Sequence, residues 1–98
     1  MILVTGDILA KSDTVDEVLA LSLEHVRRSR AEPGCISHAV HRDAENALRL
    51  VFVEQWVDRA ALLAHFAVPA SRAFAKAVGG LAAAAPTIQI YEAEPVKL

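Results

Sequence analysis

The chain has 98 residues, enough for one domain and too few for two, so we take residues 1–98 as a single domain. Its net charge of −2, from 10 basic and 12 acidic residues, gives no positive field for gripping a nucleic-acid backbone. Hydrophobic residues make up 54% of the chain, so we expect a second subunit to hide part of the apolar surface.

The cysteine content and the N-terminus indicate the compartment. Cys35 is the single cysteine, which allows no internal disulfide and favours a reducing environment. The first residues lack a basic segment and reach an acid at Asp7, so they do not resemble a signal peptide. No apolar run approaches the ~20 residues of a membrane span. We therefore expect a cytoplasmic protein that binds neither membrane nor nucleic acid.

The first half of the chain predicts a strand, a helix and a turn. Residues 2–10 are mainly apolar and β-branched, which is typical of a strand. Thr14 and Glu17 have the spacing of a capping box and predict the start of a helix. Pro33 cannot continue that helix, and Gly34 tolerates the turn that follows.

Two further strands and two short helices follow. Residues 35–42 and about 48–57 predict strands, and the short polar connection between them favours an antiparallel hairpin. Asp58 is placed to cap a short helix, and Pro69 is placed to begin another. Residues 87–94 alternate in polarity and predict a fourth strand.

This order is β-α-β-β-α-β, which predicts an α+β ferredoxin-like fold with a four-stranded antiparallel sheet. The second helical unit is broken at Val68–Pro69. The strand at residues 48–57 is apolar on both faces, whereas the helices suffice to cover only one. We therefore expect a homodimer in which two sheets pack together as a dimeric α/β barrel.

The histidines do not show the spacing of a metal site. His38 and His41 look like a ligand pair, but positions three apart on a strand point to opposite faces. His25 and His65 fall on predicted helices, outside any recognised ligand motif. No glycine-rich phosphate loop is present either, so we expect neither a metal nor an organic cofactor.

One group of residues could carry chemistry. Glu54 and Trp56 lie two apart on a strand and project to the same face, and the next helix carries His65 and Phe66. Such a set would bind a flat apolar molecule with a polar edge, using aromatic walls and a titratable base. Each residue also has a structural interpretation, which spacing alone favours: Trp56 as core, Glu54 as the partner of an arginine, and His65 as a helix cap.

Two further residues are weaker candidates for substrate binding. Arg72 would orient an anionic or phenolic oxygen of a substrate. Tyr91 would reach either the pocket or a dimer interface. Both residue types are more often found at the rim or on the surface.

Four short runs also suggest a family. They are Glu-Pro-Gly-Cys at 32–35, His-Arg-Asp at 41–43, Glu-Gln-Trp at 54–56 and Ala-Ala-Leu-Leu-Ala-His-Phe at 60–66. Their order and spacing resemble the antibiotic-biosynthesis-monooxygenase family, over nearly the whole chain. The resemblance implies a homodimer of ferredoxin-like subunits, each with a pocket between sheet and helices.

The best-understood members of that family are cofactor-independent oxygenases of phenols and quinols. By resemblance, His65 would be the base, Trp56 and Phe66 would wall the aromatic ring, and Glu54 would orient the imidazole or a hydroxyl. We therefore expect a cofactor-independent monooxygenase that oxidises a small aromatic phenol or quinol with molecular oxygen.

The chain departs from the family pattern in two places. Ala70 stands where a second histidine is usual, and Ala75 stands where the haem-degrading branch has its haem ligand, which disfavours haem chemistry. Membership of another branch of the family, which acts on small phosphorylated sugars, remains an alternative. So do a non-catalytic ligand-binding dimer and an isomerase or lyase of a small carbonyl compound.

Overall fold

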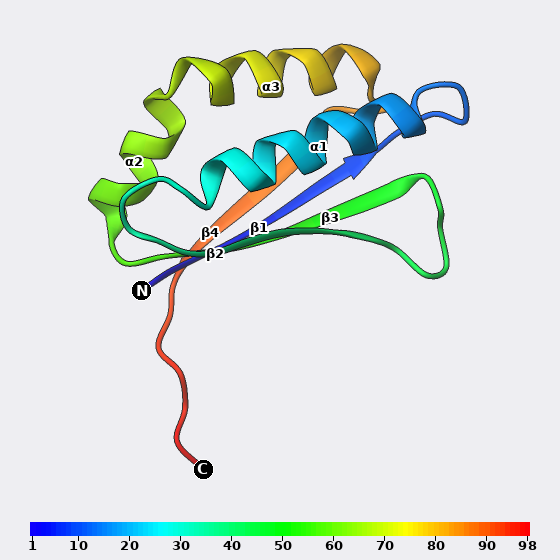
Figure 1. Ribbon diagram of the computed structural model, residues 1–98. Coiled ribbons are helices and arrows are strands. Elements are labelled where there is room, and N and C mark those ends of the chain that lie inside the picture. The colour runs from blue at the N-terminus through cyan, green and yellow to red at the C-terminus, as the bar shows by residue number, and fades with distance from the viewer.

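The computed structural model describes all residues 1–98 and places three helices on one face of a four-stranded sheet (Figure 1). The elements in chain order are β1 (Ile2–Leu9), α1 (Val15–Ser29), β2 (Cys35–Arg42), β3 (Arg49–Trp56), α2 (Arg59–Ala67), α3 (Pro69–Leu81) and β4 (Thr87–Glu92). The predicted order of elements and the break between the two short helices are confirmed.

The sheet has the strand order β2-β3-β1-β4, and every neighbouring pair is antiparallel. β1 is central, with Val4 opposite Glu54 of β3 on one side and Ile90 of β4 on the other. This is the ferredoxin-like α+β fold predicted from the sequence. The sheet of one chain is open, because β2 and β4 form its two edges.

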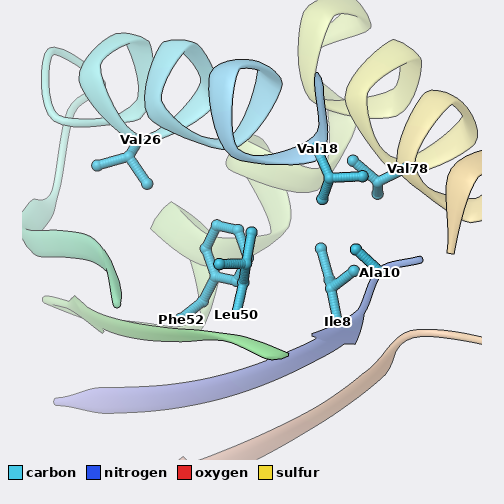
Figure 2. Packing of buried hydrophobic residues seen from close by; sticks show 7 residues of the cluster. All are labelled: Ile8, Ala10, Val18, Val26, Leu50, Phe52 and Val78. Carbon is cyan, nitrogen blue, oxygen red and sulfur yellow. The ribbon is translucent and has the colours of Figure 1, made fainter. Parts of the chain in front are cut away.

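The main core lies between the sheet and the helices α1 and α3 (Figure 2). Its seven buried residues are Ile8, Ala10, Val18, Val26, Leu50, Phe52 and Val78. They come from alternate positions of β1 and β3 and from helical spacing on α1, which is how a strand and a helix each present one apolar face. A smaller cluster, which includes Trp56 and Leu62, fixes α2 on the other end of the sheet.

The helix ends follow local chemistry, with one correction to the prediction. Asp58 caps α2 as predicted, since its side chain accepts a hydrogen bond of 2.8 Å from the backbone N–H of Ala61. Thr14 forms no capping box. Its hydroxyl donates instead to the carbonyl oxygen of Leu81 at 2.9 Å and so ties α1 to the end of α3. Gly79 and Gly80 lie in the last turn of α3, which ends at Leu81.

The turn between α1 and β2 depends on Gly34. Its φ of +81° is in the left-handed region that favours glycine. A Cβ atom at this position would lie 2.5 Å from Cβ of Ala61 and 2.9 Å from Cγ2 of Val57. The turn is therefore packed directly against α2, and it brings Glu32 to that helix.

The face of the sheet opposite the helices is bare in a single chain (Figure 1). Its half-buried central positions carry apolar side chains at Leu3, Ala39, Val51 and Val53. Polar side chains on the same face are Thr5, Asp7, Arg49 and Gln55. None of the three helices combines the length and the hydrophobicity that a membrane crossing requires.

Candidate functional site

A cavity of about 280 Å³ opens between the sheet and the helices α2 and α3. Its polar wall is formed by His25 of α1, Glu54 of β3 and His65 of α2. Its apolar wall includes Phe52, Phe66, Phe74, Val78 and Ile88. A larger hollow of about 700 Å³ lies beside the N-terminus and the C-terminal tail, but it contains no imidazole and is open to solvent. The smaller cavity is therefore the candidate site.

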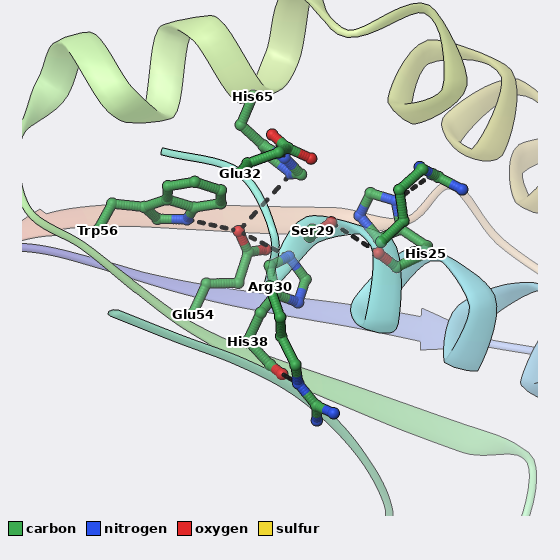
Figure 3. A network of polar contacts seen from close by, with 9 residues as sticks. His25, Ser29, Arg30, Glu32, His38, Glu54, Trp56 and His65 are labelled. Carbon is green, nitrogen blue, oxygen red and sulfur yellow. Dashed lines mark hydrogen bonds and ion pairs between the residues drawn. The ribbon is translucent and has the colours of Figure 1, made fainter. Parts of the chain in front are cut away.

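The imidazole of His65 lies next to the carboxylate of Glu32 (Figure 3). Its Nδ1 lies 2.9 Å from Oε1 of Glu32, and only 3% of His65 is exposed. A carboxylate accepts hydrogen bonds and has none to donate when ionised, so in the neutral ring Nδ1 carries the hydrogen and Nε2 keeps a lone pair. The ring also lies against the indole of Trp56, with 4.6 Å between the ring centroids.

Glu54 lies on the cavity side of β3 and is surrounded by nitrogen atoms. Its Oε1 accepts a hydrogen bond of 3.0 Å from the indole N–H of Trp56 and lies 3.1 Å from His38 Nε2 and 4.0 Å from His65 Nε2. Burial raises the pKa of Glu54, but His38, Trp56 and His65 together outweigh burial and hold the pKa below its usual value. The side chain is therefore a carboxylate at neutral pH.

His38 lies beneath Glu54, outside the cavity lining, and is 1% exposed. Neither of its ring nitrogens makes a well-directed hydrogen bond, although Nε2 is close to Glu54. This contact is short, at 3.1 Å, but its direction is poor for a hydrogen bond. His41 faces the opposite side of the sheet, as predicted for two positions three apart on a strand.

His25 is a neutral imidazole in the cavity wall. Its ring stacks on Phe74 with centroids 4.1 Å apart, and its Nδ1 lies 3.0 Å from Nη2 of Arg28. Burial lowers the pKa of His25 to about 3, and electrostatic interactions with His38, His65 and Arg28 act in the same direction. The imidazole therefore carries no charge at neutral pH.

The three buried histidines form a possible ligand set, because one ring nitrogen of each lies within 4.8 Å of the others. Their hydrogen bonds do not suit a metal ion. His25 Nδ1 accepts from Arg28, so the neutral ring carries its hydrogen on Nε2 and offers no free lone pair there. The nearby guanidinium also repels a cation. That the chain needs no metal stays a prediction.

The structure brings some of the predicted site residues together and leaves others apart. His65, Glu54, Phe66 and Arg72 line the same cavity. Trp56 is fully buried and supports Glu54 and His65 from outside the cavity. Tyr91 lies apart from the cavity, and its hydroxyl donates to Gln89 on β4.

Four contributors were not singled out from the sequence as site residues: His25, Glu32, His38 and Phe74. One signal existed for His25. It lies seven residues after Val18 and next to Val26, on the buried stripe of α1, where an ionisable side chain is unusual. Glu32 carried no such signal, because its partner His65 is 33 residues away.

Comparison with known proteins decides the family. Residues 1–77 match the family model described as antibiotic biosynthesis monooxygenase. The chain belongs to the antibiotic biosynthesis monooxygenase family. The resemblance predicted from the sequence is thus confirmed at the level of the family.

The chain is also similar to one uncharacterized relative and to solved structures. An uncharacterized protein of Synechocystis is 38% identical over 91 residues, and the match spans 93% of this chain but only 62% of that protein. A crystal structure of an antibiotic biosynthesis monooxygenase matches with a TM-score of 0.89 and 29% identity, over 97% of this chain and 100% of the other. A putative family member from Deinococcus radiodurans shares the fold with a TM-score of 0.94 at 23% identity, over 100% and 98% of the two chains.

Proposed function

We propose that this protein is a cofactor-independent monooxygenase that oxidises a small aromatic phenol or quinol with molecular oxygen. Membership of the family supports a monooxygenase-like role. The observation that carries the proposal is the environment of the two ring nitrogens of His65. Glu32 holds its outer nitrogen, and its inner nitrogen faces an apolar-walled cavity next to the Glu54 carboxylate.

His65 would act as the general base. Its Nε2 takes the proton of the bound hydroxyl, and the imidazolium that forms lies between the carboxylates of Glu32 and Glu54. Both carboxylates stabilise that positive charge, and more strongly in a buried site than in water. The product of this step is an electron-rich phenolate in an apolar cavity.

The phenolate would then react with oxygen directly. It transfers one electron to O₂, and the resulting radical and superoxide combine to form a carbon–oxygen bond. His65 returns its proton to give a hydroperoxide. The hydrogen on the same carbon and the terminal OH of the hydroperoxide then leave together as one molecule of water, and a carbonyl remains. One oxygen atom enters the product and the other leaves as water. The substrate supplies all the electrons, so no co-reductant is needed.

The cavity favours a substrate of one or two rings with polar substituents. Its volume of about 280 Å³ is at the small end of ligand pockets, which begin near ~300 Å³. Phenylalanine side chains supply flat walls. Ser71 is buried in the same lining, and its hydroxyl has no hydrogen-bond partner, so it would meet a second oxygen of a quinol.

Oxygen uptake tests the proposal. Purified protein without added cofactor would be given hydroquinones, naphthoquinols and anthrones, beside a protein-free blank. We expect uptake that depends on the protein and falls about 10²- to 10⁴-fold in His65→Ala. The matched control is Glu24→Ala, since Glu24 is exposed on α1 and lies outside the cavity lining. No uptake above the blank with any of these compounds would contradict the proposal.

The same base and cavity would also suit proton transfer on a small carbonyl compound. An isomerase or lyase would turn over its substrate under strict anaerobiosis, whereas the proposed oxidation stops without O₂. Tight binding of an aromatic ligand with no turnover under either condition would instead indicate a binding protein.

We also propose that the working unit is a homodimer and that it is cytoplasmic. The bare face of the sheet, with Leu3, Ala39, Val51 and Val53 at its centre, supports a second copy packed sheet to sheet. The unpaired Cys35 supports a reducing compartment.

A further inference from the structure

His25 and His65 face the same space from two different helices (Figure 3). Both line the cavity, and their ring centroids are 5.3 Å apart. The Nδ1 atom of each ring is hydrogen-bonded to a charged side chain, and the two side chains carry opposite charges. The partner of His25 is the cation Arg28, and the partner of His65 is the anion Glu32. The Nε2 atoms therefore differ in what they offer to a bound molecule.

The difference follows from the donors and acceptors available. A guanidinium can only donate, so Nδ1 of His25 must accept, and the hydrogen of the neutral ring is on Nε2. An ionised carboxylate can only accept, so Nδ1 of His65 must donate, and in the neutral ring Nε2 has a free lone pair. The two rings are thus fixed in opposite tautomers, one a donor and the other an acceptor toward the cavity.

One oxygen atom of a substrate can form hydrogen bonds with both imidazole rings. A ring nitrogen of each histidine lies within 4.8 Å of the other. An oxygen about 2.8 Å from each of two nitrogens can bridge a gap of up to that size, at an angle of up to about 120°, which suits a phenolic oxygen. A hydroxyl at this point can donate to His65 while it accepts from His25.

We propose that His25 is a second catalytic residue, whose Nε2–H hydrogen-bonds the substrate oxygen from which His65 removes the proton, and that it thereby selects substrates with an ionisable hydroxyl on an aromatic ring. The proposal rests on the proposed function for its reaction but not for its binding geometry. The negative charge that develops on the oxygen strengthens the bond from His25 most in the transition state and in the phenolate. Arg28 is a positioning residue, because it fixes the tautomer of His25 without reaching the cavity lining.

The tautomers can be read directly by NMR. Long-range ¹⁵N–¹H spectra of the whole protein at neutral pH should show the hydrogen of His25 on Nε2 and that of His65 on Nδ1. In Arg28→Met the His25 signal should change toward a mixture of both tautomers, while that of His65 stays the same. A hydrogen on Nδ1 of His25 in the parent protein would overturn the proposal, and so would a stoichiometric transition metal that His25→Phe removes.

A binding experiment tests the role without any turnover. 4-Nitrophenol changes its visible absorbance when it ionises, so its pKa can be measured while it is bound. We expect the pKa of the bound nitrophenol to lie about 1–2 units below its value in water in the parent protein. In His25→Phe, which keeps the aromatic stack on Phe74 but has no donor, at least half of that shift should disappear. His25→Gln, which keeps an N–H, should restore part of it.

The two proposals can fail separately. If the nitrophenol pKa is shifted but no oxygen is taken up, His25 still donates a hydrogen bond to the phenolate, and the proposed monooxygenase reaction is wrong. If oxygen uptake is as fast in His25→Phe as in the parent protein, the proposed role of His25 is wrong, whereas the proposed monooxygenase reaction stands. An equal nitrophenol pKa in the parent protein and in His25→Phe, with the ligand bound to both, would also overturn the role of His25.

Discussion

Glu32 and His65 are 33 residues apart in sequence, yet Oε1 of Glu32 lies 2.9 Å from Nδ1 of His65. The α1–β2 turn carries the carboxylate and α2 carries the imidazole. Gly34 packs this turn against α2, so the geometry of the base depends on a close backbone approach outside the cavity.

The first prediction concerns Glu32. Glu32→Gln keeps the size of the side chain but removes the charge that stabilises the His65 imidazolium. We expect kcat to fall at least about tenfold with little change in KM, because Glu32 does not line the cavity. Steady-state oxygen uptake measures both constants. Glu24→Gln, an exposed position on α1, is the matched control, and an equal loss in both variants would contradict the role of Glu32.

The second prediction concerns the turn. Gly34→Ala should lower the free energy of unfolding by about 2–4 kcal/mol, because φ is positive and the new Cβ would clash with Ala61 and Val57. Gly79→Ala is the matched control. It lies in α3 with open space around it, so it should raise stability by up to about 1 kcal/mol. Urea unfolding of both variants tests this, and equal effects of the two would contradict it.

The third prediction concerns pH. The pKa of His25 is lowered from 6.5 to about 3 in the folded state, so the unfolded chain binds more protons between these values. His25 therefore contributes stability that is complete above pH ~6.5 and is lost as the pH falls toward ~3. Its share of the loss between pH 7 and pH 4 is at most about 3 kcal/mol.

Urea unfolding at several pH values measures this slope. Glu54 and Asp43 also have lowered pKa values, so acid destabilises the parent protein through them as well. His25→Gln cannot titrate, and its stability should fall less steeply between pH 6.5 and pH 4 than that of the parent protein. Identical slopes would show that His25 is not held neutral by the fold.

The fourth prediction concerns assembly. Val53→Glu places a charge at the centre of the bare face of the sheet and should convert a dimer into a monomer. Ala20→Glu, on the exposed side of α1, should leave the dimer intact. Size-exclusion chromatography with light scattering measures the oligomeric state of the parent protein and of both variants. A parent protein that is monomeric at micromolar concentration would remove the dimer proposal.

The fifth prediction concerns Cys35. Burial raises the pKa of its thiol, and the carboxylates of Glu32 and Glu54 act in the same direction. We expect alkylation by iodoacetamide near neutral pH to be at least about tenfold slower than for an exposed thiol. Ser12→Cys in a Cys35→Ala background supplies that exposed thiol, and equal rates at the two positions would contradict the prediction.

Local signals in the sequence determined the elements of this fold. Asp58 and Pro69 mark helix starts through the bonding and the φ angle of single residues, and the alternation along residues 49–56 separates two faces of one strand. Glu54 and His65 were singled out because each lies close in sequence to the strand–helix junction, and the two do line one cavity.

Only the tertiary structure decided how the histidines meet. The spacing argument on His38 and His41 was correct for that pair, since they face opposite sides of the sheet. It could not show that α1 and α2 bring His25 and His65 to His38, because contacts between elements depend on how whole faces pack and not on local spacing. Trp56, expected to wall the substrate, is fully buried for the same reason: the second core cluster, with Leu62 of α2, closes over it.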